Sequence, residues 1–560
     1  MVGQKKWKID IKWIVILVIV AFLLIFEVFP LFYLLIKSLF SGGSFSWEAY
    51  RRVYTYDLNW IALKNTMITA GFTTILGVAI AFPLAFLVGR TDMYGKKFFR
   101  TLFVVTYMVP PYVGAMAWLR LLNPNAGVLN RFLMKIFGLG AAPFNIYTIS
   151  GIVWVLTCFF YPYAFITISR AMEKMDPSLE EASRVSGASP LKTLFKVTIP
   201  MMTPSIIAAG LLVFVASASA YGIPSIIGAP GQIYTVTMRI IDFVHIGSEE
   251  GLTDAMTLAV FLMLISNIIL YISTFVVGRK QYITMSGKST RPNIVELGKW
   301  RLPITIIISI FSFFVIILPF ITVAITSFTV NMGKPLTLSN LSLKAWEKVF
   351  SRASIISSTT NSFITATAAA FFGILISCVM AYLLQRTNVK GKRIPDFLIT
   401  LGSGTPSVTI ALALIISMSG KFGINIYNTL TIMVVAYMIK YMLMGMRTVV
   451  SAMSQVHPSL EEAAQISGAN WLRMLKDVTL PLIGASIVAG IFLIFMPSFY
   501  ELTMSTLLYS SNTKTIGYEL YIYQTYHSQQ VASALATAIL LFVILVNYIL
   551  NKLTKGQFSI

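Results

Sequence analysis

The sequence predicts an all-α polytopic membrane protein with about twelve transmembrane helices arranged as two parallel six-helix repeats. First, 57% of the 560 residues are apolar and only 11% are charged, whereas soluble chains carry about 25% charged residues. Second, the apolar runs are continuous rather than alternating, which favours helices over a β-barrel. Third, one segment recurs in the second half. This composition excludes a soluble multidomain enzyme and a disordered chain.

The spans follow from the thickness of a bilayer, because a helix crosses the hydrocarbon core with about 20 apolar residues. The first apolar run extends from the basic stretch Lys5-Lys6-Trp7-Lys8 to Phe40, which is too long for a cleaved signal peptide. The twelve stretches lie near 13–39, 61–89, 99–121, 148–169, 201–222, 255–277, 302–328, 359–384, 396–419, 427–447, 481–505 and 532–551.

The distribution of Lys and Arg predicts the orientation. With twelve spans both termini lie on one side, and the loops on that side hold 28 of the 43 Lys and Arg residues. The opposite loops hold 14, and Lys440 lies within a span. The positive-inside rule therefore predicts cytoplasmic termini. The net charge of +22 is explained by these loops facing anionic lipid, and no basic run interleaved with aromatic residues suggests nucleic-acid binding.

An internal repeat divides the chain. Asn65-Thr66 opens a span that ends in Arg90-Thr91, and Asn361-Ser362 opens one that ends in Arg386-Thr387, 296 residues later. Further along the offset is 281, where residues 177–200 and 458–481 are identical at 14 of 24 positions. Both segments follow an even number of spans, so the repeat is parallel. We expect a first repeat at 1–278, a cytoplasmic linker at 279–301 and a second repeat at 302–560.

The recurring segment predicts a helix, a glycine turn and a second helix. The pairs Ser178/Glu181 and Ser459/Glu462 have capping-box spacing, and a glycine at a helix end tolerates the left-handed conformation. The turns fall at Gly187 and Gly468. The second helix restarts at Ser189-Pro190 or at Asn470, and we expect it to stop before Pro200 or Pro481.

A short apolar stripe beside paired carboxylates is typical of an interaction surface. An ordinary loop that packs on its own bundle is the alternative. The stripe residues are Leu179, Ala182 and Val185 in the first copy and Leu460, Ala463 and Ile466 in the second.

These segments resemble the EAA loop of permease subunits of binding-protein-dependent ABC importers, and the resemblance extends from about residue 60 to 550. It implies the type I ABC importer permease fold in a bacterial cell membrane. It also implies that each loop forms a coupling helix and that each coupling helix binds one copy of an ABC ATPase subunit, so that the permease takes two copies. Ser183 and His457 depart from the usual pattern. The residues carrying the resemblance are Glu180, Glu181, Ala182, Gly187, Ala188, Glu461, Glu462, Ala463, Gly468 and Ala469.

The chain itself is not expected to be an enzyme. Gly287-Lys288-Ser289 is only half of a phosphate loop, because the first glycine of that motif would have to be Tyr282. We therefore expect no cofactor on this chain, and ATP and Mg on the partner ATPase.

The substrate is suggested by two weaker segments, 219–238 and 500–520, which resemble the ferric-iron importer group. Importers of phosphonates, thiamine or sugar phosphates are alternatives with the same architecture. An extracytoplasmic binding protein would deliver the substrate. A secondary ion-coupled transporter is the alternative from another class, but it predicts more intramembrane charges and leaves the duplicated loops unexplained.

Four residues are candidates for the substrate path. Polar groups within spans mark pathways, and a hard ferric ion prefers carboxylate and phenolate oxygens. An interfacial carboxylate and packing aromatics are the alternative interpretations. The candidates are Glu501, Tyr500, Tyr161 and Tyr163, and the sequence leaves any metal-ligand set undefined.

Overall fold

The computed structural model describes residues 11–41, 44–175, 178–279, 294–331, 334 and 337–554, which are almost entirely helical. The first half contains α1 (Ile11–Leu23), α2 (Phe29–Ser38), β1 (Phe40–Ser41), β2 (Ser44–Phe45), α3 (Glu48–Thr55), α4 (Asp57–Arg90), α5 (Lys96–Tyr107), α6 (Pro111–Leu122), α7 (Val128–Phe137), α8 (Ile149–Lys174), α9 (Ser178–Val185), α10 (Pro190–Thr193), α11 (Ile199–Ala218), α12 (Val236–Ile246) and α13 (Glu249–Arg279).

The second half repeats this order, except that β1, β2 and α7 have no counterpart among its described residues and α24 stands in place of a π-helical turn at Pro224–Gly228. It contains α14 (Arg301–Ser312), α15 (Leu318–Thr326), α16 (Lys344–Ser351), α17 (Ala353–Arg386), α18 (Arg393–Gly404), α19 (Ser407–Ser417), α20 (Leu430–Gln455), α21 (Pro458–Ile466), α22 (Trp471–Met474), α23 (Leu480–Phe499), α24 (Thr503–Leu508), α25 (Ile516–Tyr526) and α26 (Gln529–Leu553).

The prediction of about twelve spans is confirmed, with a correction to two of them. Ten described helices are long and apolar enough to cross a membrane, and two bent pairs raise the number to twelve. The stretches expected to be continuous at 99–121 and 396–419 are bent, by 103° between α5 and α6 and by 108° between α18 and α19. The cause is proline at each bend, because the helical region is disfavoured for the residue before a proline; Thr405, before Pro406, has ψ of 135°.

The prediction that the second short helix stops before Pro200 or Pro481 is wrong. Instead, α10 continues through a π-helical turn at Leu194–Thr198 into α11, and α22 does the same through Leu475–Thr479 into α23. Proline lacks an N–H and its ring clashes with the carbonyl four residues earlier in an α-helix. The wider turn avoids this conflict, since the N–H of Ile199 bonds to the carbonyl of Leu194.

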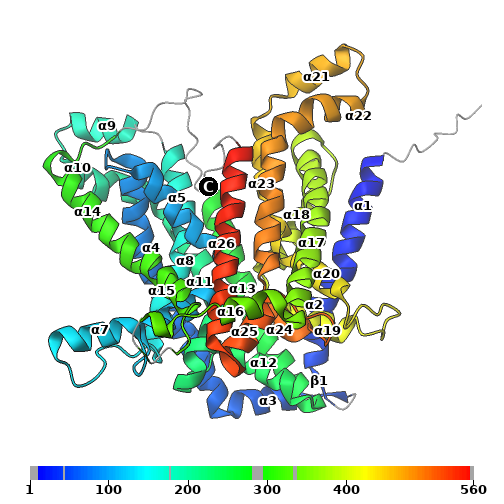
Figure 1. The fold of residues 1–560 in the computed structure, drawn as a ribbon. Coiled ribbons are helices and arrows are strands. Elements are labelled where there is room, and N and C mark those ends of the chain that lie inside the picture. The colour runs from blue at the N-terminus through cyan, green and yellow to red at the C-terminus, as the bar shows by residue number, and fades with distance from the viewer. Residues whose placement is uncertain are drawn as a thin grey trace, which may run out of the picture.

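The two halves point the same way. In Figure 1, α9 and α10 lie at the same end of the bundle as α21 and α22, whereas α3, α12 and α25 lie at the other end. The first span of each half packs on the other half, with α2 against α19 and α15 against α6.

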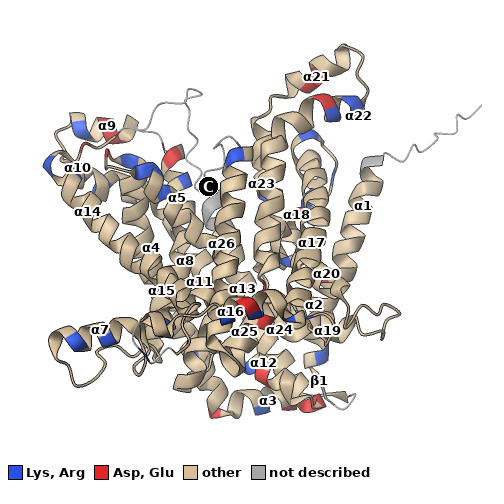
Figure 2. Ribbon diagram, viewed as in Figure 1, with Lys and Arg blue, Asp and Glu red and all other residues tan. Residues whose placement is uncertain are grey.

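Figure 2 shows Lys, Arg, Asp and Glu gathered mainly at the two ends of the bundle. Of the linker expected at 279–301, residues 280–293 lie outside the described residues.

Candidate coupling loops and translocation path

Each predicted glycine turn ends its helix as expected. Gly187 has φ of +82° and Gly468 has φ of +87°. After the first turn, the N–H of Ala188 bonds to the carbonyl of Ser183 at 3.1 Å; Ala469 bonds to Ala464 at 3.0 Å in the second. These six-to-one bonds define Schellman motifs, which require the left-handed conformation at the glycine.

The second short helices are capped as predicted, but α21 is not. The two residues before Ser178, on which the first predicted capping box depends, lie outside the described residues. Ser189 Oγ accepts from the N–H of Lys192, and Asn470 Oδ1 from that of Arg473 at 2.8 Å. α21 begins at Pro458 with His457 as its N-cap, whose Nδ1 accepts from the N–H of Ser459. The capping box predicted for Ser459 is therefore wrong, because proline at the first helical position moves the helix start one residue earlier.

The predicted apolar stripes face outward. The side chains of Val185 and Ile466 are 88% and 87% exposed, and Leu179 and Leu460 are about half exposed. Glu181, Ala182, Glu462 and Ala463 are also exposed. Exposed apolar side chains on a short, well-capped helix indicate a surface for another molecule.

The structure separates the two glutamates of each pair. Glu180 is only 7% exposed, and its Oε1 accepts from Thr198 Oγ1 at 2.7 Å. Its Oε2 lies 3.7 Å from Nη1 of Arg90, at the end of α4. Arg90 also donates to the carbonyl of Met172 at 2.8 Å. This arginine clamp ties α9, the first candidate coupling helix, to the ends of α4 and α8.

The second half builds the same clamp with a shorter ion pair. Arg386 Nε lies 3.0 Å from both carboxylate oxygens of Glu461, and Thr479 Oγ1 donates to Oε1 at 3.1 Å. Arg386 Nη2 donates to the carbonyls of Met453 and Val456. Arg90 and Arg386 were not among the residues predicted for the site. Both arginines lie at the end of an apolar span and at equivalent positions of the repeat, and this pattern in the sequence could have identified them.

A polar cluster joins the two halves in the interior of the bundle. Glu501 is 8% exposed and lies in the short break between α23 and α24. It accepts a hydrogen bond from Tyr441 Oη and one from the N–H of Met504 at 3.0 Å. Tyr112, from the first half, donates to the carbonyl of Tyr500 at 3.1 Å. Nearby in α20, Lys440 donates to the carbonyls of Ser403 and Thr405, on either side of Gly404 at the bend.

The structure brings three of the four predicted path residues together. Glu501 and Tyr500 adjoin in the chain, and Tyr163 lies near both. The ring of Tyr163 also contacts that of Tyr107, with centroids 4.8 Å apart. Tyr161 does not join them: it is fully buried, in edge contacts with Phe103 and Phe311. The described residues contain no group of three His, Cys, Asp or Glu side chains suited to a metal ion.

Known sequences match this arrangement of repeats and loops. The family "Binding-protein-dependent transport system inner membrane component" matches residues 81–281 and again 373–556. The chain belongs to this family. The permease is therefore a multi-pass membrane component of a binding-protein-dependent importer, as the resemblance implied.

Among curated relatives, the permease is 27% identical to the putative ferric transport system permease protein FbpB 1 of Haemophilus influenzae, over 90% of this chain and 79% of that one. It is 25% identical to the ferric transport system permease protein FbpB of Actinobacillus pleuropneumoniae, over 96% and 77%. A solved bacterial alginate ABC transporter in complex with a periplasmic protein is 19% identical, with a TM-score of 0.41, over 51% of this chain and 100% of that chain.

Proposed function

We propose that this permease forms the translocation path of an ATP-driven importer for ferric iron. The observation that supports this substrate is the similarity to ferric transport permeases over nine-tenths of the chain. The interior cluster agrees chemically, because carboxylate and phenol oxygens suit a hard trivalent cation. Glu501 and Tyr441 supply the two oxygens in direct contact.

The energy source is proposed to lie on other chains. Two copies of an ABC ATPase dock on the exposed stripes of α9 and α21, and ATP with Mg binds to them rather than to this permease. Both coupling helices then lie in the cytoplasm with the termini, and an extracytoplasmic binding protein contacts the opposite end. Closure of the ATPase dimer moves α9 and α21, and the arginine clamps pass this motion to α4 and α17.

Reconstituted vesicles test the proposal. Vesicles that contain the permease, the ATPase encoded beside it and the neighbouring binding protein should import radioactive ferric iron only with ATP inside the compartment that holds the coupling helices. Thiamine and a phosphonate should not compete. Uptake driven by a proton or sodium gradient without ATP would contradict the proposal, as would ATP hydrolysis stimulated by a phosphonate and not by iron.

A further inference from the structure

A cavity of about 250 Å³ opens in the second half at the end of the bundle opposite the coupling helices, between α16, α25 and the starts of α17 and α26. It is lined by three cationic side chains, Lys348, Arg352 and Lys514, together with Glu519 and His527. Lys348 and Arg352 are exposed, and Lys514 is half-buried. None of the three has an ion-pair or side-chain hydrogen-bond partner among the described residues.

The carboxylate in this cavity is also unusual. Glu519 is only 5% exposed and has no hydrogen-bond or ion-pair partner for its side chain among the described residues. The three cations outnumber this carboxylate, so the cavity has a positive potential that favours an anionic group.

The equivalent place in the first half carries different charges with different partners. Two hydrogen bonds fix the correspondence: Thr66 Oγ1 accepts from the N–H of Val236, and Ser362 Oγ accepts from the N–H of Ile516. Positions in α3 and α16 therefore differ by 296, and positions in α12 and α25 by 280. By this correspondence Lys348 replaces Arg52.

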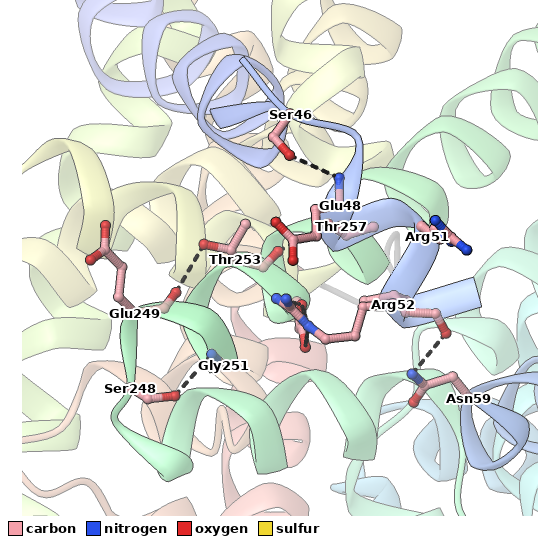
Figure 3. Close-up of polar contacts among 12 residues, drawn as sticks. Ser46, Glu48, Arg51, Arg52, Asn59, Ser248, Glu249, Gly251, Thr253 and Thr257 are labelled. Atoms are coloured by element: carbon pink, nitrogen blue, oxygen red, sulfur yellow. Dashed lines mark hydrogen bonds and ion pairs between the residues drawn. The ribbon is translucent and has the colours of Figure 1, made fainter. Parts of the chain in front are cut away.

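In the first half these charges are paired internally. Arg52 reaches from α3 to the start of α13, the region shown in Figure 3, and its Nη2 lies 2.6 Å from Oδ1 of Asp254. This hydrogen bond raises the pKa of Arg52 above its ordinary value. Arg239 donates to Asn59 and packs over the ring of Phe243 at 4.6 Å. Both cations at this place are therefore held by the chain's own side chains.

The second half lacks two of these three partners, since Ile355 stands in place of Asn59, whereas Tyr523 keeps an aromatic ring where the first half has Phe243. Ala534 stands where the first half has Asp254, so Lys348 loses its acid. Glu519 stands in place of Arg239, and Arg352 in place of Tyr56. These substitutions leave Lys348 without the acid that pairs with Arg52 in the first half.

We infer that this cavity is a docking site for an acidic side chain of the extracytoplasmic binding protein. The inference deepens the proposed function and rests on it, because that function places a binding protein at this end of the bundle. The volume suits one or two carboxylate side chains rather than a folded element. Since the second half carries the unpaired cations here, the binding protein docks with its acidic lobe over α16 and α25.

Binding measurements on the full-length permease in lipid nanodiscs test this docking site. The probe is the binding protein encoded beside the permease, immobilised on a sensor. Lys348→Glu and Lys514→Glu should each weaken its affinity about tenfold, which corresponds to about 1.4 kcal/mol. Lys344→Glu, on the same helix α16 but outside the cavity lining, is the charge-matched control and should change affinity less than about twofold.

The direction in which a fourth variant changes the affinity distinguishes docking from a structural role. Glu519→Gln removes a repelling carboxylate, so affinity for the binding protein should rise by about threefold to tenfold. Unchanged affinity in Lys348→Glu, Lys514→Glu and Glu519→Gln would overturn the docking site. So would tight binding of inorganic phosphate that Lys348→Glu abolishes while docking stays normal, because the cavity would then hold a free anion. Shifted affinities in a permease that imports no iron would support the docking site and contradict only the proposed substrate.

Discussion

The two halves of the permease are nearly identical at their candidate coupling helices and different at the interior polar cluster. Each coupling helix ends in a glycine turn and is held by an arginine, a glutamate and a threonine at equivalent positions. In the interior, by contrast, Lys440, Tyr441 and Glu501 of the second half correspond to Phe159, Phe160 and Ala220 of the first. Under the proposed function, two ATPase copies would use both candidate coupling helices, whereas the charged groups of the interior cluster come from the second half alone.

The largest effect is expected where the halves agree. Replacing Gly187 and Gly468 together by Asp places a side chain at φ of +82° and +87°, which costs a non-glycine residue about 1–2 kcal/mol at each turn. No heavy atom lies within 4 Å of the position that a Cβ would take at either glycine, so the bundle should still fold. ATP-driven uptake in reconstituted vesicles should fall to background, and normal uptake by the double variant would contradict the coupling role.

The two clamps should differ in strength. Arg386→Met leaves the buried carboxylate of Glu461 without its cation, which costs about 3–5 kcal/mol. Arg90→Met should cost less, because the ion pair with Glu180 spans 3.7 Å rather than 3.0 Å. Thermal unfolding followed by tryptophan fluorescence measures both. Adding Glu461→Gln to Arg386→Met should recover much of the loss, and equal destabilisation by the two arginine variants would refute the difference.

The interior cluster provides a comparison between two buried tyrosines. Tyr441→Phe removes the hydrogen bond to Glu501. Iron uptake should fall about tenfold, which corresponds to a loss of about 1.4 kcal/mol of interaction free energy. Tyr161→Phe is the control, because the Tyr161 hydroxyl is buried without a hydrogen-bond partner among the described residues. Its uptake should match that of the unmodified permease. Equal losses in both variants would place the path elsewhere.

The smallest effect distinguishes the two helix starts. His457→Ala removes the N-cap of α21, and the loss of such a cap costs about 0.5–2 kcal/mol. Hydrogen exchange of the first turn of α21 should accelerate, while that of α9 stays unchanged. Faster exchange in both helices would show that the two coupling loops unfold as one unit.

The sequence by itself determined the features that depend on local chemistry. Apolar run length defined the spans, and the repeated segment defined a parallel duplication with Gly187 and Gly468 at the turns. The sequence also showed the prolines, but not how each one changes its helix. Pro406 bends a span, whereas Pro200 and Pro481 follow π-helical turns that keep their helices continuous. The neighbouring helices decide which occurs, because they determine whether the chain gains more contacts by bending or by widening one turn.

Only the tertiary structure decided which polar residues act together. Glu180 and Glu181 are adjacent and chemically identical, yet one is clamped by Arg90 and the other faces outward. Tyr161 and Tyr163 lie two residues apart in one helix and point to different surroundings. A local pattern carries no information about a partner that lies many turns of helix away in the chain, since that partner is selected by the packing of helices distant in sequence.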